Sequence, residues 1–264
     1  MKKNLKLFIQ FFLLIILVTS VSWNQSGKSK REYYQLTVYR YNTAVQEKIL
    51  DNYLENALLP AYHRMGIKQV GIFKNLANDT VPAKLLYVFL PLKTFEMADK
   101  FSATLLKDKV YQAAGDEYIN AVYTNPPYTR METILLKAFS LAPEMQFPVL
   151  KSGKKERVYE LRSYESPSEK LYQKKVHMFN EGDEIGLFKR LNFNAVFYSE
   201  VIAGSKMPNL MYMTCFESME DRDAHWKSFV NDDQWKKLSA MPEYKNLVSK
   251  NEINFLRPAE YSDF

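Results

Sequence analysis

The chain has 264 residues with an ordinary globular balance, 47% hydrophobic and 25% charged, and a formal net charge of +6. Lys2, Lys3 and Lys6 account for half of that charge, and the remaining +3 is too small to predict nucleic-acid binding. The single cysteine, Cys215, excludes an internal disulfide and a cysteine-rich zinc site, and with 8 glycines we expect no glycine-rich phosphate loop.

The N-terminal segment has the pattern of a secretory signal. Three lysines precede an apolar run at 7–18, which only Gln10 interrupts and which small residues follow. The run is short for a membrane-spanning helix. We therefore predict a signal peptide at 1–22 and a polar tether at 23–31. The mature chain would have no membrane span and would be exported to the periplasm or the extracellular space. The alternative is that the apolar run is kept as an uncleaved anchor.

The first half alternates strand and helix patterns in the order β-α-β-β-α-β. Strands are indicated by short runs rich in Tyr, Val and Leu, and helices by apolar residues three and four positions apart. The predicted strands are 32–41, 67–73, 85–90 and 129–136, and the predicted helices are 43–64, 94–105 and 109–118. Thr43 can cap the first helix, and Pro60 should bend or interrupt it near Asn56.

The second half shows the same order. Its predicted strands are 159–164, 194–202, 210–216 and 253–256, and its predicted helices are 167–179, 218–229 and 232–238. Ser218 and Asp221 have the form of a capping box with Asp in place of Glu.

The two halves repeat one outline, which means that one unit is used twice. Residues 34–39 match 159–164 at an offset of 125, and Asp108 matches Asp232 at 124. Further matches are Leu85 with Leu210, Tyr87 with Tyr212, Phe73 with Tyr198, and Thr94 with Ser218. The first unit is predicted at 32–140 and the second at 157–258, with a linker at 141–156 and a tail at 259–264.

Each unit alone would carry helices on one face of its sheet and leave the other face bare and apolar. So large an apolar face is not stable in water. Two such sheets pressed face to face bury it within one chain. The predicted fold class is therefore α+β, with tandem ferredoxin-like β-α-β-β-α-β units packed sheet to sheet as an intramolecular α+β barrel.

Three segments of the second unit resemble a known family. They are Val-Tyr-Glu-Leu-Arg-Ser-Tyr at 158–164, Phe-Glu-Ser-Met-Glu-Asp-Arg at 216–222 and Asp-Gln-Trp at 233–235. In order and spacing they resemble the NIPSNAP domain, of the dimeric α+β barrel superfamily. The first unit looks like a diverged copy, with Thr37 where the second has Arg162 and Tyr111 where the second has Trp235. The resemblance implies ferredoxin-like units that pair through their sheets. The wider superfamily includes cofactor-free monooxygenases, haem-handling enzymes and small dehydratases.

The first predicted strand of the second unit carries the main candidate site. Glu160, Arg162 and Tyr164 alternate along it and therefore share one face. If that face points into the barrel, the group could orient a polar ligand, or Glu160 could act as a base. The alternative is a structural ion pair between Glu160 and Arg162 at the sheet interface, joined by Arg222. The full set of ligand-binding candidates is Glu160, Arg162, Tyr164, Tyr212, Arg222 and His177. The first unit has neutral Gln35 and Thr37 at the charged positions, so a charged site would exist in one half only.

The histidines give no metal site. His63, His177 and His225 all fall in predicted helices, and none has a second histidine three or four residues away. The nearest approach is His177 with Glu181, four residues apart. A surface position for His177 is favoured over haem ligation. We predict no metal and no cofactor.

Two functions fit this sequence. The first is an exported, non-catalytic module that binds a small apolar or aromatic ligand in the barrel interior, or that uses its sheets for assembly, including assembly into a homo-oligomer. The alternative is a cofactor-free α+β barrel enzyme of the monooxygenase or isomerase type, acting on a small aromatic or apolar substrate. A closed, filled barrel would favour the first, and an open pocket on which Glu160 and Arg162 converge would favour the second. The sequence does not decide whether the chain is an enzyme.

Overall fold

The computed structural model describes residues 30–264. The predicted signal peptide at 1–22 and most of the predicted tether lie outside this part of the chain. Within residues 30–264, no helix is long and apolar enough to cross a membrane. Residues Arg31–Phe264 form one compact unit.

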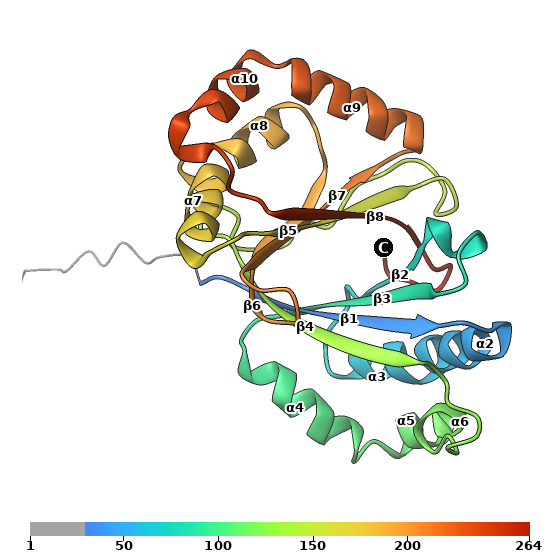
Figure 1. The fold of residues 1–264 in the computed structure, drawn as a ribbon. Coiled ribbons are helices and arrows are strands. Elements are labelled where there is room, and N and C mark those ends of the chain that lie inside the picture. Colours follow the sequence, from blue (N-terminus) through green and yellow to red (C-terminus); the bar gives the residue numbers. More distant parts are fainter. Residues whose placement is uncertain (1–29) are drawn as a thin grey trace, which may run out of the picture. The chain divides into compact units, whose positions relative to one another are not determined.

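Eight antiparallel strands of the described residues close into one barrel (Figure 1). They are β1 (Tyr33–Tyr41), β2 (Gly71–Asn75), β3 (Lys84–Leu92), β4 (Arg130–Ala138), β5 (Val158–Glu165), β6 (Ala195–Ala203), β7 (Asn209–Phe216) and β8 (Lys250–Pro258). The first half contributes the order β4-β1-β3-β2 and the second half β8-β5-β7-β6. Both are the ferredoxin-like order, and the pairs β2–β8 and β4–β6 join the halves. The predicted intramolecular α+β barrel is confirmed.

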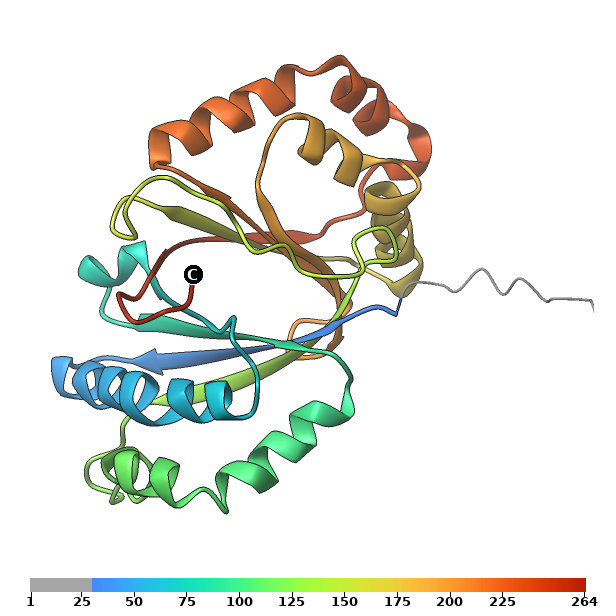
Figure 2. The ribbon, with the colours of Figure 1, turned by 180° about the vertical axis from the view of Figure 1, so that it is seen from behind.

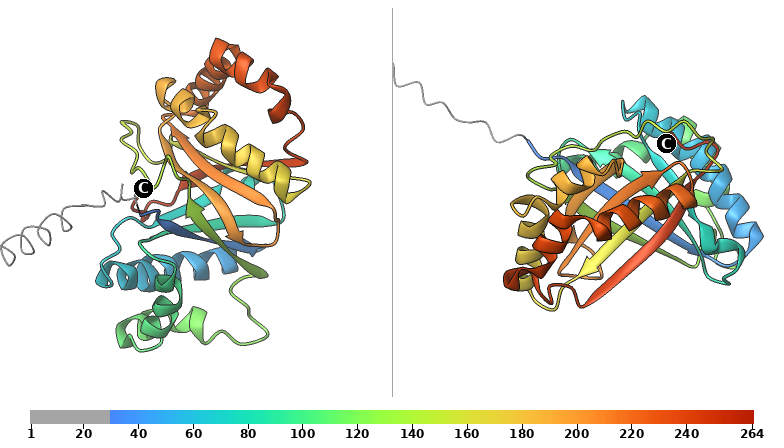
Figure 3. Two further views of the ribbon diagram at one scale, coloured as in Figure 1. Left: turned by 90° about the vertical axis from the view of Figure 1, so that its left-hand side faces the viewer. Right: turned by 90° about the horizontal axis from the view of Figure 1, so that it is seen from above.

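The main helices cover the outside of this barrel in two layers, one from each half, on opposite sides (Figure 2). The first layer holds α2 (Ala44–Tyr53), α3 (Leu59–Arg64), α4 (Glu96–Leu105), α5 (Lys109–Ala114) and α6 (Asp116–Ile119). The second holds α7 (Glu169–Asn180), α8 (Glu184–Arg190), α9 (Met219–Asn231) and α10 (Asp233–Ala240). The left view of Figure 3 shows the same separation. Thr43, Ser168 and Ser218 cap α2, α7 and α9, each accepting a backbone N–H in the first turn.

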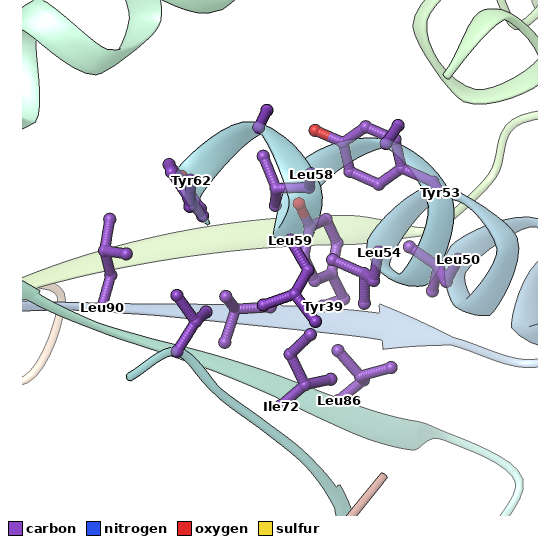
Figure 4. Close-up of a cluster of buried hydrophobic side chains, with 14 of the residues drawn as sticks. Tyr39, Leu50, Tyr53, Leu54, Leu58, Leu59, Tyr62, Ile72, Leu86 and Leu90 are labelled. Carbon is purple, nitrogen blue, oxygen red and sulfur yellow. The ribbon is translucent and has the colours of Figure 1, made fainter. Parts of the chain in front are cut away.

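The predicted interruption of the first helix near Asn56 is confirmed. Helix α2 passes into a π-helical segment at Leu54–Leu58 and continues as α3, with Pro60 in its first turn. Proline lacks a backbone N–H and its ring collides with the preceding turn of a regular helix. A local widening of that turn accommodates the ring. Helix-facing side chains of the first sheet, including Leu86 and Leu90, pack beneath this helix pair in the cluster of Figure 4.

The match between Asp108 and Asp232 is also confirmed. Asp108 caps α5 and Asp232 caps α10, each accepting a backbone N–H within its helix. Each carboxylate also pairs with an arginine at the end of an earlier helix, Arg64 for the first and Arg190 for the second. The same contact, an arginine at the end of one helix with the capping aspartate of a later helix, therefore connects the helices in both halves.

The match of Tyr87 with Tyr212 is wrong by one residue. Thr37 pairs with Val88 across β1 and β3, whereas its equivalent, Arg162, pairs with Tyr212 across β5 and β7. The structural counterpart of Tyr212 is therefore Val88. A shift of one residue moves a side chain to the other face of a sheet, so Tyr87 packs in the barrel interior and Tyr212 against the helices. The same correction applies to two further matches, Leu85 with Leu210 and Phe73 with Tyr198.

Aromatic side chains from both halves fill the barrel interior. Phe89 and Phe197 stack with their ring centroids 4.9 Å apart, and Tyr34 lies 5.3 Å from each. Phe73 and Tyr159, at 4.9 Å, continue the packing. All five are at most 2% exposed. At one end of the barrel a cavity of only about 40 Å³ remains. The interior, which the sequence suggested as the ligand site, is therefore a packed core, since small-molecule pockets are typically several times larger.

Residues 259–264, expected as a tail, pack against β2 and into the barrel. The carboxylate of Asp263 accepts the backbone N–H of Val70 at 2.8 Å. The Phe264 ring is 1% exposed and lies 5.6 Å from that of Phe73. This segment therefore contributes to the core shared by the two halves.

One carboxylate of the second half holds two backbone groups of the linker at 141–156. Glu217 accepts the backbone N–H groups of Lys151 at 2.9 Å and Ser152 at 2.8 Å. These donors stabilise the ionised form and lower the pKa of Glu217 to about 2.

Candidate functional site

The candidate residues of β5 and β7 face the helical layer, not the barrel interior. Leu161 and Met213 point into the barrel, and Arg162 and Tyr212, their neighbours along the strands, point outward beneath α7, α8 and α9. Glu160, Arg162 and Tyr164 share one face of β5, as predicted from the sequence. That face does not line the barrel interior. The group lies instead between the sheet and its helices.

Glu160 lies at the centre of the group and is fully buried. Its Oε1 accepts from Arg162 Nε at 2.5 Å and from Arg222 Nη2 at 3.0 Å. Its Oε2 accepts from Arg222 Nε at 2.8 Å and from Trp226 Nε1 at 2.7 Å. The predicted association of Glu160 with Arg162 and Arg222 is thus present, and it ties α9 to β5.

A second chain of contacts leads from Arg162 to two tyrosines. Arg162 Nη1 donates to Tyr164 Oη at 3.0 Å, and Tyr164 Oη lies 2.9 Å from Tyr212 Oη. Despite burial, the nearby phenols and Glu160 raise the pKa of the Arg162 guanidinium. Burial raises the pKa of Tyr212 well above its usual value, which keeps its hydroxyl protonated. The guanidinium also stacks on Trp226, with Cζ 3.7 Å from the ring centroid.

Sequence reasoning missed a buried ion pair beside this group. Lys175 Nζ donates to Glu184 Oε2 at 2.8 Å, and both side chains are under 8% exposed. Lys175 also lies over the Phe179 ring at 4.6 Å. Lys174 and Lys175 together look like a solvated helix face. The one available signal was the helical period, which places Lys175 beside the apolar positions Met178 and Phe179.

These side chains line a pocket of about 370 Å³ between the sheet and α7–α10, called here the helix-side pocket. Its lining residues are Arg162, Tyr164, Lys175, Glu184, Tyr212, Arg222, Trp226, Phe229, Val230 and Trp235. Four of the six sequence candidates therefore line it, and Glu160 supports it from below. Larger hollows of about 540 and 640 Å³ lie along the linker, but the described residues that line them form no comparable buried polar network.

His177 does not join the site. Its Nδ1 lies 2.8 Å from Tyr244 Oη, on the side of α7 away from the pocket residues. His225 Nδ1 contacts the carbonyl oxygen of Asp221 at 2.8 Å, within its own helix. In the part of the chain that the structure describes, no three His, Cys, Asp or Glu side chains are grouped to hold a metal ion.

In the first half, tyrosines fill the space equivalent to the helix-side pocket. Tyr39, the counterpart of Tyr164, packs against Tyr118 and Tyr128. Tyr53 stacks on Tyr118 with centroids 3.6 Å apart, and its hydroxyl lies 2.8 Å from that of Tyr111, the counterpart of Trp235. The predicted asymmetry between the halves is thus present in the packing as well as in the charges.

Comparison with known proteins agrees with the fold and the resemblance. The NIPSNAP family model matches residues 159–263, which confirms the resemblance of the second unit. No curated protein matches the chain.

Solved structures of three proteins share the barrel over most of its length. A candidate monooxygenase from Fusobacterium nucleatum has a TM-score of 0.57 at 4% identity, covering 87% of this chain and 93% of that one. A candidate monooxygenase from Lactobacillus acidophilus has 0.56 at 13% identity, covering 86% and 94%. An anthrone oxidase-like protein has 0.50 at 7% identity, covering 88% and 93%. Identities this low establish similarity of fold alone.

Proposed function

We propose that the chain is a small-molecule-binding module whose ligand occupies the helix-side pocket of the second half, once per chain. The observation that carries this proposal is the buried polar network of Glu160, Arg162 and Tyr164, which borders a pocket of about 370 Å³. A pocket of this volume, with aromatic walls and a few fixed polar groups, is typical of small-molecule sites. The filled barrel and the tyrosine-filled first half support a single site.

The alternative is a cofactor-free enzyme acting in the same pocket. The names of the structural relatives and the aromatic walls suit an oxygenase of aromatic substrates. Such chemistry starts with removal of a proton by a base. Glu160 accepts four hydrogen bonds, which is the full capacity of a carboxylate, and is not free for that role. No histidine lines the pocket among the described residues. Binding is therefore better supported than turnover.

Native mass spectrometry of the full chain, purified from cells, tests the binding proposal. We expect one small molecule per chain, released on denaturation. Trp235→Ala, which removes a pocket wall, should abolish its retention. The matched control is Tyr111→Ala at the equivalent position of the first half, which should retain the molecule. Equal retention by both variants would place the ligand elsewhere and contradict the proposal.

We also propose that the chain is exported. Support comes from the basic start followed by the apolar run at 7–18. Intact-mass analysis of the exported protein should give a chain that begins between about Val21 and Trp23. A full-length cytoplasmic product would defeat this proposal.

A further inference from the structure

We infer that the ligand of the helix-side pocket is an aromatic anion, a ring system that carries a carboxylate or a phenolate. This inference rests on the proposed binding function and names the chemical class that the site accepts. It follows from an excess of positive charge, an excess of hydrogen-bond donors, and the aromatic walls.

The charges in and beneath the pocket do not balance. Arg162, Lys175 and Arg222 are cationic, whereas Glu160 and Glu184 supply two carboxylates. Three cations against two anions leave one positive charge. Asp223 also contacts Arg222, but it is largely exposed, so water screens that pair. A bound anion would complete this balance.

The donors of Arg162 are only partly used. A guanidinium has five N–H groups. Arg162 Nε donates to Glu160 and Nη1 donates to Tyr164. The remaining three N–H groups have no acceptor among residues 30–264. Glu160 cannot take another, because each of its oxygens already accepts two bonds.

The tyrosine pair adds one more donor. Tyr164 and Tyr212 have two hydroxyl protons, and the bond between their oxygens uses one. Tyr164 also accepts from Arg162, which uses a lone pair but no hydroxyl proton. One hydroxyl proton is therefore left without an acceptor, whichever tyrosine donates to the other. A carboxylate or phenolate oxygen could accept from this hydroxyl and from Arg162 together.

The remaining walls suit a flat ring. Phe229 and Trp235 lie with centroids 4.5 Å apart, and both line the pocket beside Trp226. Aromatic side chains favour offset or edge-to-face contact with a ligand ring. A neutral ligand would leave the donors of Arg162 unmatched, and a cationic ligand would face Arg162 and Lys175 with like charge.

Calorimetric titration of the full chain with three ligands of one shape tests this inference. The probes are 1-naphthoate, the neutral 1-naphthamide and the cationic 1-naphthylmethylammonium. We expect the naphthoate to bind at least roughly tenfold more tightly than the amide, because charge-assisted hydrogen bonds are about twice as strong as neutral ones. The ammonium ion should bind most weakly. Naphthoate affinity should fall as salt is added.

A substitution then assigns the preference to Arg162. Arg162→Gln should reduce the preference for naphthoate over the amide to within about threefold, because the variant lacks the charged donor that distinguishes the two probes. The exposed Arg130→Gln is the matched control and should leave both affinities unchanged. Equal binding of naphthoate and amide to the unaltered chain would overturn the anion inference while leaving the pocket proposal standing. Failure of all three probes to bind would contradict both. The comparison of probes on the unaltered chain decides the matter even if the variant does not fold.

Discussion

Glu160→Ala is expected to lower the free energy of unfolding by about 3–5 kcal/mol, as for a buried ion pair that loses one partner. The carboxylate is fully buried and accepts from Arg162, Arg222 and Trp226. Its removal leaves two guanidinium groups close together without their shared counterion. It also releases α9 from β5. Denaturant unfolding monitored by circular dichroism measures the change.

Two further substitutions make this prediction specific. Gln35→Ala changes the equivalent residue of the first half and should cost about 1 kcal/mol or less, since no charge is exposed by it. Arg162→Ala should cost less than Glu160→Ala, because Glu160 keeps Arg222 and Trp226. The double change Glu160→Gln with Arg162→Thr, which copies the first half, should cost less than the sum of its parts. A loss below about 1 kcal/mol in Glu160→Ala would show that the network does not stabilise the fold.

Phe89→Ala is expected to cost about 3–5 kcal/mol, the range for removal of a buried phenylalanine ring. Phe89 of the first half stacks on Phe197 of the second, and it also packs against Tyr34. The change would open a cavity where the two sheets meet. Phe89→Leu, which fills most of the volume, should lose less than half as much. Thermal and denaturant unfolding of both variants provide the measurement.

The alternative outcome for Phe89 is equally clear. If the barrel interior were a ligand cavity and not a core, the Phe89→Ala variant would lose little stability. Its free energy of unfolding would then lie within about 1 kcal/mol of that of the unaltered chain, as for a poorly packed site.

Much of the fold could be predicted because short stretches of sequence determine it. The capping side chains Thr43 and Ser218 and the effect of Pro60 each depend on a few neighbouring residues. The repeat then predicted the barrel, because two sheets that each leave one apolar face uncovered can bury both faces by packing against each other. The alignment of β3 with β7, its equivalent in the second half, could not be predicted, since a displacement of one residue leaves the apolar pattern of a buried strand almost unchanged.

The orientation of the candidate site was also beyond the sequence. Alternation along β5 shows that Glu160, Arg162 and Tyr164 share a face, but both faces of this sheet are covered. No polar face therefore marks which side meets the helices. Lys175 lies on α7 and Glu184 on α8, and the chain turns at Asp183 between the two helices. The short distance between the two side chains therefore depends on how the helices pack.

A crystal structure of the chain with 1-naphthoate tests the central claim most directly, that the ligand site lies between the sheet and helices of the second half. We predict one naphthoate per chain, with its ring beside Phe229 and Trp235 and its carboxylate within hydrogen-bond distance of Arg162. Naphthoate in the barrel interior beside Tyr34, or at the tyrosine cluster of the first half, would contradict the claim.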